Sequence, residues 1–499
     1  MVGRSAPFRP DGSQKSPPMP QPSSPDDPHA RPLDHAGKRA IVFGVLLPMF
    51  VGALDMTIVA TALPAIALAF NDYANVSWIV TVYLLTATVV TPLYGKLSDI
   101  YGRRPMMLIA LSIYLVGSLV CALAPAMWVL ILGRVILGFG SGGLIPLSQT
   151  IIGEVTTPME RPRYQTYTAT MFMVATLIGP ALGGVLSEYI HWSAIFWINL
   201  PLGLLTIAVS LRVMRRLPQR GRPHRLDIPG AVLMVGAGLT LMLALTWGGR
   251  YFPWLSWQIL GLAALSAALW AAFARHATRA AEPFVPLSVL GNRTVRSATT
   301  CGFFAVGCTT GLTIMIPLYL QMSQGLSGSA SSVAVMVYQA GTTAGSMISM
   351  QLITRVRRYR RVPLAAAMLS LMALAVLVAV PVGLPDMTFL VLVGCIGLGL
   401  GPMFPLTIIS IQNVITPREM GVATGVMGFF RSLGGTFVVA VFGAILLGGT
   451  NYVAPAPGSV DPQVFRLMFG AAFMAVFLGT VMLYGIEERP WRGPEEATP

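Results

Sequence analysis

The chain has 499 residues, of which 55% are hydrophobic and only 10% are charged, and its mean hydropathy is +0.70. This balance excludes a soluble globular protein and indicates a polytopic membrane protein. The formal net charge of +14 fits either nucleic-acid binding or an orientation signal in a membrane, and the positions of the charges decide between the two.

The first 38 residues differ in composition from everything that follows them. Residues 1 to 38 are rich in Pro and Ser, and they lack the apolar core and the cleavage site of a signal peptide. This composition predicts a disordered tail.

Fourteen apolar stretches follow, each near or above the ~20 residues that a membrane-spanning helix needs. They cover approximately residues 40 to 65, 77 to 98, 106 to 125, 127 to 152, 166 to 187, 192 to 214, 228 to 248, 255 to 274, 297 to 322, 330 to 354, 362 to 382, 387 to 412, 420 to 449 and 465 to 486. The sequence therefore predicts an all-α integral membrane fold with 14 transmembrane helices.

The basic residues of the loops alternate between the two sides of the membrane. If the N-terminus lies inside, the predicted outer segments hold only Arg250 and Arg466, while the inner loops hold the remaining arginines and lysines between helices. This alternation favours an even number of helices with both termini cytoplasmic, in the cell inner membrane (plasma membrane). The net charge is then an orientation signal, and we expect no nucleic-acid partner.

An internal repeat divides the chain into two related halves. Residues 137 to 160 recur without a gap at 396 to 419, and ten of the 24 residue pairs are identical. The fourth apolar stretch thus pairs with the twelfth, whereas a six-helix repeat would pair the fourth with the tenth. Two helices are therefore inserted between the halves, and the stretches 228 to 248 and 255 to 274 are the natural candidates.

The repeat gives the predicted domain organisation of two pseudo-symmetric six-helix bundles plus two inserted central helices. Its parts are a disordered cytoplasmic tail (1–38), an N-terminal bundle (39–214), a linker with two accessory transmembrane helices (215–296), a C-terminal bundle (297–486) and a cytoplasmic tail (487–499).

One acidic residue, Asp55, lies well inside an apolar stretch, and the glycine-rich fourth stretch carries one arginine, Arg134. At ~1.5 Å per residue, Asp55 lies ~20 Å above the inner end of its helix and Arg134 ~10 Å below the outer end of its own. In a membrane core about 30 Å thick these depths coincide. A structural ion pair and a proton-coupling site both fit, and the second is favoured because intramembrane carboxylates usually face a cavity or a partner.

The turn between the second and third stretches concentrates charge and glycine. Asp99 and Arg103 are four residues apart and can share a helix face, while Gly102 permits a turn before Arg104 and Pro105. A charged membrane-flanking turn is the plain interpretation. Two further segments, 157 to 160 and 416 to 419, have the pattern of capping boxes that begin the fifth and thirteenth helices.

The fifth stretch contains small residues at intervals of four, Gly179-Pro180 and Gly183-Gly184. They predict either a plain seam of close helix packing or a seam between the two halves that seals a cavity on one side.

Other kinds of site are not indicated. The glycine spacing after Arg134 fits a dinucleotide fingerprint, but no strand precedes it, and no phosphate-binding loop for ATP occurs. The four cysteines lie in apolar stretches without metal-ligand spacing, so we interpret them as buried thiols. We expect no cofactor, no metal and no enzymatic activity.

Four segments resemble motifs of the major facilitator superfamily. Residues 95 to 105, which begin at Gly95, resemble its signature loop, and Arg134 with Gly138 resembles its fourth-helix motif. Residues 54 to 64 are similar to the first-helix motif of its 14-helix drug:proton antiporter branch. Residues 179 to 184 resemble the motif associated with antiporters, although Ala175 stands where a glycine is usual.

The resemblance implies a secondary active transporter of alternating access that exports small amphipathic compounds, such as drugs, antibiotics or toxic metabolites, in exchange for protons. A proton-coupled symporter that imports a small solute and a non-transporting membrane scaffold or lipid-assembly partner are the alternatives. The expected partners are a small-molecule substrate, protons and the lipid bilayer, and a periplasmic adaptor protein is a further candidate.

The resemblance also implies residue roles. Asp55 and Arg134 would couple protons, and Gly95, Asp99, Gly102, Arg103 and Arg104 would form an inner gate. Asp99 would dock near the N-terminus of the thirteenth helix, at residues 416 to 421, where the positive end of the helix dipole favours a carboxylate.

Arg431 is a second intramembrane arginine, ~16 Å from the inner end of the thirteenth helix. No acidic residue in the ninth to fourteenth helices is deep enough to pair with it, and its repeat counterpart is Phe172. Backbone carbonyls and water can satisfy such a guanidinium. If Arg431 faces a central substrate cavity, it favours anionic or neutral amphiphiles over dications.

Overall fold

The computed structural model describes residues 35–73, 75–216, 226–280, 282–326, 328–353, 360–416, 419–448 and 461–487. Its helices are α1 (His35–Phe70), α2 (Trp78–Tyr101), α3 (Arg103–Ala122), α4 (Met127–Val155), α5 (Arg161–Tyr189), α6 (Ala194–Trp197), α7 (Asn199–Val213), η1 (Met214–Arg216), α8 (Ile228–Trp247), α9 (Trp257–Ala277), α10 (Leu287–Gly291), α11 (Arg293–Gln324), α12 (Gly328–Ile353), α13 (Arg361–Ala379), α14 (Asp386–Leu400), α15 (Met403–Val414), α16 (Met420–Gly448) and α17 (Pro462–Leu483). The described residues contain no strand.

The predicted fold of fourteen spanning helices is confirmed. Thirteen spans among the described residues are long and apolar enough to cross a membrane, with α6 and α7 forming one span and α14 and α15 another. The fourteenth is α12, whose 26 residues lie in the same bundle but include many Gly, Ser and Thr residues that lower its hydropathy.

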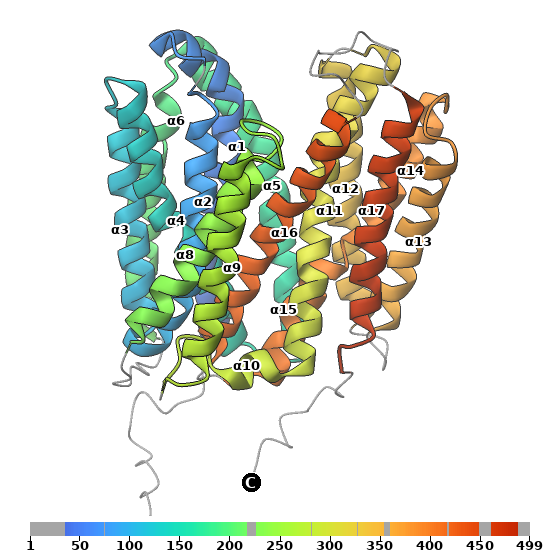
Figure 1. The fold of residues 1–499 in the computed structure, drawn as a ribbon. Helices are drawn as coiled ribbons and strands as arrows, with labels where there is room; N and C mark the ends of the chain where they lie inside the picture. Colours follow the sequence, from blue (N-terminus) through green and yellow to red (C-terminus); the bar gives the residue numbers. More distant parts are fainter. Residues whose placement is uncertain are drawn as a thin grey trace, which may run out of the picture.

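The spans form two helical bundles that stand side by side (Figure 1). Buried side chains from Ile41 to Met214, on α1 to α7 and the turn after them, form one hydrophobic core. A second core runs from Val289 to Ile486 on α10 to α17 and the turn after α17. The two cores share no residue and each lies within one half, so each half can move as a packed unit. The domain boundaries themselves stay a prediction.

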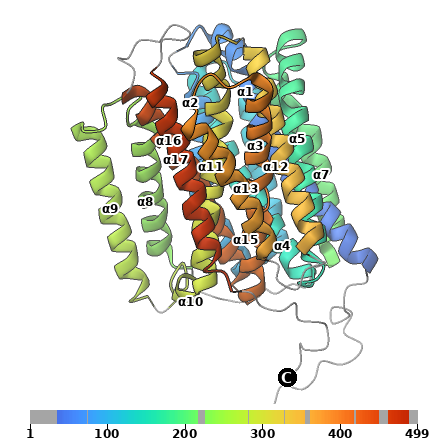
Figure 2. The same ribbon diagram turned by 90° about the vertical axis from the view of Figure 1, so that its right-hand side faces the viewer.

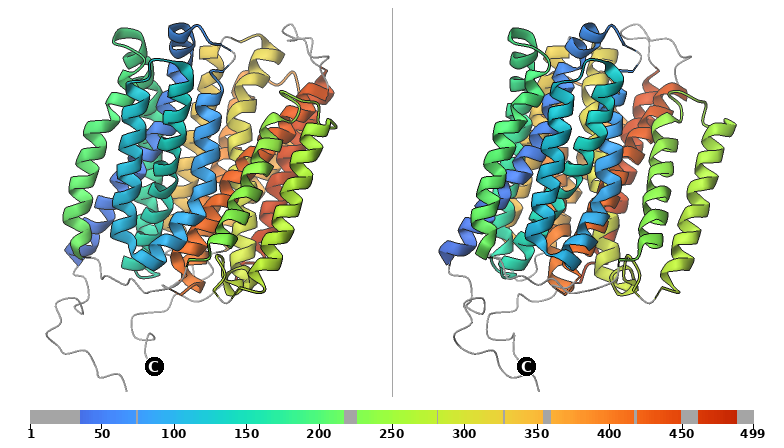
Figure 3. Two further views of the ribbon diagram at one scale, coloured as in Figure 1. Left: turned by 60° about the vertical axis from the view of Figure 1, so that its left-hand side comes forward. Right: turned by 90° about the vertical axis from the view of Figure 1, so that its left-hand side faces the viewer.

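The inserted helices α8 and α9 pack against both halves. They form a third core with Leu85 and Val89 of α2 and with Phe429 of α16. Trp270 of α9 lies 6.2 Å from the Phe429 ring. Figure 3 shows the yellow-green pair beside the blue α2 and the orange-red α16. The insertion therefore covers one side of the contact between the halves.

Side-chain caps fix several helix starts, because the first N–H groups of a helix have no partner within it. The Asn292 carboxamide accepts from the N–H groups of Thr294 and Val295 at the start of α11. The Asp461 carboxylate accepts from Gln463 at the start of α17. At its other end α11 stops at Gly325, whose φ of 67° lies in the left-handed region that glycine adopts readily.

Two helix starts differ from the sequence prediction. Helix α1 begins at His35, so the last four residues of the predicted tail are helical, and Lys38 pairs with Glu160 at 3.1 Å. Helix α5 begins at Arg161 rather than just after Thr157. The Glu160 carboxylate still accepts from the Thr157 N–H at 2.9 Å, so a separate turn precedes the helix. The rest of the predicted N-terminal tail lies outside the described residues, as do residues 417 and 418.

The repeated segment adopts different backbones in its two copies. Helix α4 is continuous through Gly143, whereas the matching position in the second copy is Pro402, where α14 ends and α15 begins. Proline lacks the N–H of a helical hydrogen bond and its ring clashes with the preceding turn, which accounts for the break.

The start of α1 and the end of α17 lie at the same end of the bundles (Figure 2). We call this the inner end, following the distribution of arginine in the loops. The ribbons of the two halves lie close together at the inner end and diverge toward the outer end (Figure 1).

Candidate functional site

Asp55 and Arg134 form an ion pair in the core of the N-terminal half. Nη1 of Arg134 donates to Oδ2 of Asp55 at 2.9 Å, and the two side chains are 1% and 0% exposed. The observed pair agrees with the equal membrane depths expected for the two residues from the sequence. Their roles in proton coupling stay a prediction.

Neighbouring groups complete the surroundings of this pair. Nε of Arg134 donates to the carbonyl of Ile79 at 3.1 Å, and the Tyr83 ring lies 4.0 Å from Cζ of the guanidinium. The Asn199 amide donates to Oδ1 of Asp55 at 3.3 Å and to Ser118 at 3.2 Å. Oδ1 of Asn199 is buried and has no protein partner in the described part of the chain.

The arrangement holds both charges without contact with solvent. Two ions taken out of water need mutual attraction and further hydrogen bonds to offset the loss of hydration, and removal of either partner leaves the other uncompensated. Since Asp55 is enclosed, any proton must reach it through a rearrangement of the surrounding helices. The stability of the ion pair therefore depends on how the surrounding helices are arranged.

At the inner end of α2, Asp99 accepts two hydrogen bonds from the first turn of α16. Its carboxylate oxygens lie 3.1 Å from the Gly421 N–H and 2.9 Å from the Val422 N–H. Arg103 lies 2.5 Å from Asp99 and 2.6 Å from Glu154. Asp99 thus meets the helix start that the sequence analysis assigned to it, and the contact joins the two halves.

Glycines let α2 and α16 approach closely beside this contact. A methyl group at Gly95 would collide with the carbonyl of Gly421, and one at Gly425 would lie 3.0 Å from Cα of Pro92. Gly102 has a φ of 94° and makes the turn between α2 and α3. Arg104 is the second residue of α3 beside this turn, and its buried Nε has no partner among the described residues.

Two polar contacts and one packing contact between the halves at the inner end were not predicted from the sequence. Arg161 of α5 donates to Oδ1 of Asn413, and Gln412 of α15 donates to the carbonyl of Gln149 at 3.0 Å. Gly153 of α4 packs on Gln412, since a methyl group there would lie 2.8 Å from Cδ of Gln412. The amide side chains Gln149, Gln412 and Asn413, near the inner ends of apolar stretches, are the sequence feature from which these contacts could have been predicted.

The small residues of α5 do not lie where their functional interpretation placed them. Methyl groups at Gly179 and Gly183 would collide with Thr57 and Ile58 of α1, so these glycines form a packing seam within the N-terminal half. Pro180 is exposed, and a methyl group at Gly184 would meet nothing within 4 Å. The predicted seam between the halves is therefore corrected for Gly179 and Gly183.

Arg431 lies between helices of the C-terminal half. Its guanidinium carbon is 5.5 Å from the Phe404 ring of α15, and its stem runs along Gly302 of α11, where a methyl group would lie 3.1 Å from Cγ. The side chain is partly exposed, and no ion pair involves it among the described residues. It is a cation held at the edge of the bundle core without an acidic neighbour.

Metal and thiol chemistry find no support in the described part of the chain. It contains no group of three or more His, Cys, Asp or Glu side chains placed to hold a metal. The four cysteines are unpaired, and three are buried as predicted while Cys395 is half-buried.

Comparisons with known proteins agree with this fold. The family model described as Major Facilitator Superfamily matches residues 45–439. The multidrug transporter protein MdtP of Bacillus subtilis is 31% identical over 406 residues, which cover 81% of this chain and 75% of that protein. Multidrug resistance protein 3 of the same species is 30% identical over 410 residues, which cover 82% of this chain and 80% of that protein.

A solved structure supports the fold independently of close sequence similarity. The crystal structure of the human organic anion transporter MFSD10 superposes with a TM-score of 0.65 at 15% identity, covering 89% of this chain and 99% of that one. At this identity the likeness concerns the fold alone.

Proposed function

This chain belongs to the major facilitator superfamily, whose members are membrane transporters rather than enzymes, and we propose that it exports small amphipathic compounds in exchange for protons by alternating access. Relatives at about 30% identity are named for multidrug transport and multidrug resistance, which supports export of toxic compounds. The exported compounds would include drugs, antibiotics and toxic metabolites.

The observation that carries the proton coupling is the enclosed pair of Asp55 and Arg134 at 2.9 Å. A carboxylate is stable at this depth only while the guanidinium faces it. Movement of the N-terminal half that separates the two would favour the protonated carboxyl, and their return would expel the proton. Proton uptake and release would thereby be tied to the conformation of the transporter.

The inner contacts supply the matching gate. Three hydrogen-bonded contacts connect the halves at the inner end: Asp99 accepts from the first turn of α16, Arg161 donates to Asn413, and Gln412 donates to the carbonyl of Gln149. They hold that end closed and must break before the protein can open to the inside. The roles of Gly95, Gly102, Arg103 and Arg104 in this gate, and of Pro180 and Gly184 in the antiporter motif, are part of the same proposal. Gly179 and Gly183 are left out of it, because they pack against α1 of the same half.

Arg431 would set the charge preference of the substrate. Asp55 and Arg134 neutralise each other inside the N-terminal half, so the partly exposed Arg431 supplies the net charge that a substrate between the halves would meet. A single cation without an acidic neighbour attracts anionic or neutral amphiphiles and repels dications.

We place this multi-pass membrane protein in the cell inner membrane with both termini cytoplasmic. The arginine-rich loops between the spans carry this orientation. The domain limits at residues 38, 214, 296 and 486 follow from the same reading of the chain. A periplasmic adaptor protein stays a candidate partner.

The test measures transport and its direction. Inside-out vesicles that contain the protein should accumulate amphipathic dyes or weak acids when their lumen is acidified, and accumulation should stop when a protonophore collapses the gradient. Vesicles with Asp55→Asn are the matched control. Proton-driven uptake by right-side-out vesicles would instead favour the symporter, and a complete lack of transport across a broad panel of compounds would favour the scaffold.

A further inference from the structure

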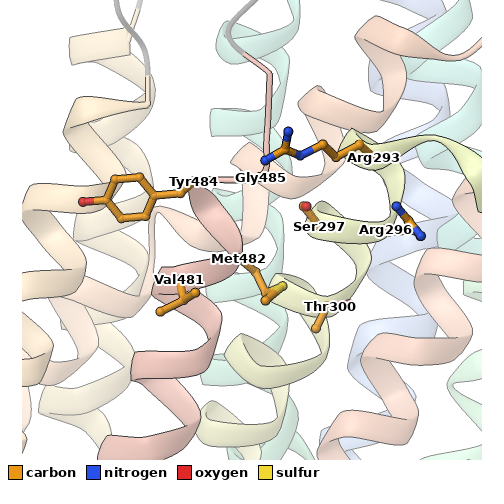
Figure 4. Close-up of a pocket in the computed structure, with 8 residues that line it drawn as sticks. All are labelled: Arg293, Arg296, Ser297, Thr300, Val481, Met482, Tyr484 and Gly485. Carbon is orange, nitrogen blue, oxygen red and sulfur yellow. The ribbon is translucent and has the colours of Figure 1, made fainter.

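A cavity of about 390 Å³ lies at the inner end of the C-terminal half, away from the contacts between the halves. It is open to the outside and is lined by the first turns of α11 and the last turn of α17 (Figure 4). The residues that matter here are Arg293, Arg296, Ser297 and Thr300 of α11 with Val481 and Met482 of α17. Neither the ion pair of the N-terminal half nor Arg431 belongs to this cavity.

Two arginines line the mouth of the cavity. Arg293 and Arg296 are exposed and lie three residues apart, which places them on one side of α11. Neither forms an ion pair or a side-chain hydrogen bond within the described part of the chain. A third cation, Arg360, donates to the carbonyls of Tyr484 and Ile486 and so anchors the end of α17 beside the cavity.

A buried hydroxyl stands behind the two arginines. Ser297 is only 8% exposed, lines the cavity, and has no hydrogen-bond partner among the described residues. Gly485 faces it, since a methyl group at that position would collide with Oγ of Ser297. In Figure 4 the Arg293 side chain reaches toward Gly485, while the Tyr484 ring points away from both arginines. The lack of a side chain at 485 is what lets this hydroxyl lie against the backbone at the end of α17.

The cavity continues onto the surface that faces lipid. Val481 is 41% exposed and lies on the same side of α17 as the exposed Leu467, Met474 and Phe477. From Arg293 to Thr300 the lining descends ~10 Å along α11, at ~1.5 Å per residue. The lining is therefore cationic at the membrane surface, hydroxylated one turn deeper and apolar where it meets the acyl chains.

We propose that this cavity binds the phosphate headgroup of an anionic phospholipid from the inner leaflet. Arg293 and Arg296 pair with the phosphate, because guanidinium groups bind phosphate oxygens through paired N–H donors. Ser297 donates to a headgroup or glycerol oxygen. An acyl chain lies along Met482 and Val481 and continues into the bilayer, which a free phosphate cannot do. The bound lipid would tie α11 to α17 at the inner end.

The test compares three ligands on the purified, delipidated full chain in detergent. Phosphatidylglycerol, phosphatidylcholine and inorganic phosphate are each titrated while the thermal unfolding temperature is followed. We expect phosphatidylglycerol to raise this temperature with saturation and the other two to leave it nearly unchanged. In Arg293→Gln/Arg296→Gln the apparent affinity should fall about 25-fold, since each arginine near the surface contributes about fivefold, or ~1 kcal/mol.

Arg275→Gln is the matched control, because Arg275 is an exposed arginine at the inner end of α9 that does not line the cavity. It should keep the phosphatidylglycerol affinity of the unaltered chain. If the double variant does not fold, Ser297→Val is the second probe, since it removes the hydroxyl, and it should weaken binding severalfold.

Three results would overturn the proposal. Equal stabilisation by phosphatidylcholine would show that no anionic headgroup is recognised. An unchanged response in the double variant and in Ser297→Val would place the lipid elsewhere. Stabilisation by inorganic phosphate alone, equal to that by phosphatidylglycerol, would identify a free anion as the ligand. None of these measurements depends on transport activity, so the outcome is independent of the proposed export function.

Discussion

Arg134 engages three kinds of partner at once, and together they keep a charge stable inside the N-terminal half. Nη1 donates to Asp55, Nε donates to the carbonyl of Ile79, and the guanidinium lies 4.0 Å from the Tyr83 ring centre. Loss of one partner of such a buried pair typically costs ~3 to 5 kcal/mol, because the remaining charge has no water to hydrate it. The residue is therefore placed both to stabilise Asp55 and to penalise its neutralisation.

Asp55→Asn should insert and fold with a lowered unfolding temperature but lose proton-coupled transport. The carboxamide can still accept from Arg134, yet it cannot bind and release a proton. The measurement is the release of protons from purified protein on addition of substrate. Glu188→Gln serves as the control, since the Glu188 side chain is exposed and makes no hydrogen bond among the described residues. Normal proton release from the Asp55→Asn protein would remove Asp55 from the coupling mechanism.

Arg431→Gln should reduce export of weak acids at least several-fold and leave neutral lipophilic compounds less affected. The reason is that Arg431 is the only charged residue in the sequence at mid-membrane depth in the C-terminal half, and the variant removes this charge. Export of matched acidic, neutral and dicationic compounds from cells measures the effect. Arg466→Gln, at an exposed arginine of α17, should change none of them. Strong resistance to dicationic biocides that persists in Arg431→Gln would contradict the charge preference.

At the residue scale, the sequence identified charges but not the neutral partners of those charges. Asp55, Arg134 and Arg431 stand out because ionisable groups are rare in apolar stretches. Tyr83 and Ser118 belong to residue types that are common in spanning helices and need no functional explanation. Asn199 is the exception, since an amide in an apolar span is costly unless paired, and it was the signal available for the third member of the site.

At the scale of secondary-structure elements, the proposed inner gate is a contact between the N-terminus of α16 and the Asp99 carboxylate of α2. Asp99 of α2 accepts from the two N–H groups that open α16, and the glycines beside it allow the backbones to touch. Helix-dipole interactions of this kind contribute ~0.3 to 1 kcal/mol. That amount can shift a two-state equilibrium several-fold without locking it, as a gate requires.

Asp99→Asn should shift the protein toward the inward-open state. The amide keeps one acceptor but loses the charge that the helix start and Arg103 favour. The readout is the rate at which an impermeant maleimide labels Gln412→Cys in inside-out vesicles, in a background without the native cysteines. The rate should rise two- to fivefold, about what ~0.3 to 1 kcal/mol allows. Asp386→Asn, at the first turn of α14, is the control, and an equal rate in both would count against the gate.

Asp227 offers a pH-dependent test of the accessory helices. Burial would raise the pKa of its carboxyl, but hydrogen bonds from the Gly230 N–H, His276 and the Phe284 N–H outweigh burial and hold the pKa below its usual value. A carboxyl with a lowered pKa stabilises the fold above its unfolded pKa of ~3.9, and this stabilisation is lost as the pH falls through the folded pKa.

Asp227→Asn should therefore lower the unfolding temperature at pH 7, by an amount that reflects the ~1 kcal/mol typical of a lost helix cap. The difference from the unaltered chain should shrink as the pH falls below about 4. Thermal unfolding of the purified protein at several pH values measures both. A difference that is independent of pH would show that the carboxylate charge plays no part in this contact.

The elements themselves could be predicted because membrane thickness fixes their length and loop arginines fix their direction. The positions of helix breaks and the neighbours of the small residues could not be predicted in this way. Pro402 breaks the helix where Gly143 of the first copy allows it to continue, and a boundary of this kind depends on one residue within an otherwise repeated segment. The glycines at 179 and 183 predicted close packing correctly, but small residues do not reveal which neighbour they meet, and they meet α1 of the same half.

On the scale of the whole molecule, two separately closed cores are joined at the inner end and bridged on one side by α8 and α9. The repeat in the sequence predicted the two halves and the insertion between them. It did not predict that the inserted pair covers the contact of α2 with α16, because that placement depends on tertiary packing of apolar faces alone. The arrangement leaves the contact of α5 with α12 as the other side on which the halves meet.

If the halves rock about these contacts, a bond across the inner end must stop transport. Gly153 and Gln412 suit such a bond, since a methyl group at Gly153 would lie 3.2 Å from Cγ of Gln412, the atom whose place a cysteine sulfur at position 412 would take. Gly153→Cys/Gln412→Cys, in a background without the native cysteines, should crosslink on mild oxidation and lose more than nine-tenths of its export. Reduction should restore export, and each single variant should be insensitive to oxidant. Full export by crosslinked protein would exclude opening at the inner end as a step of the cycle.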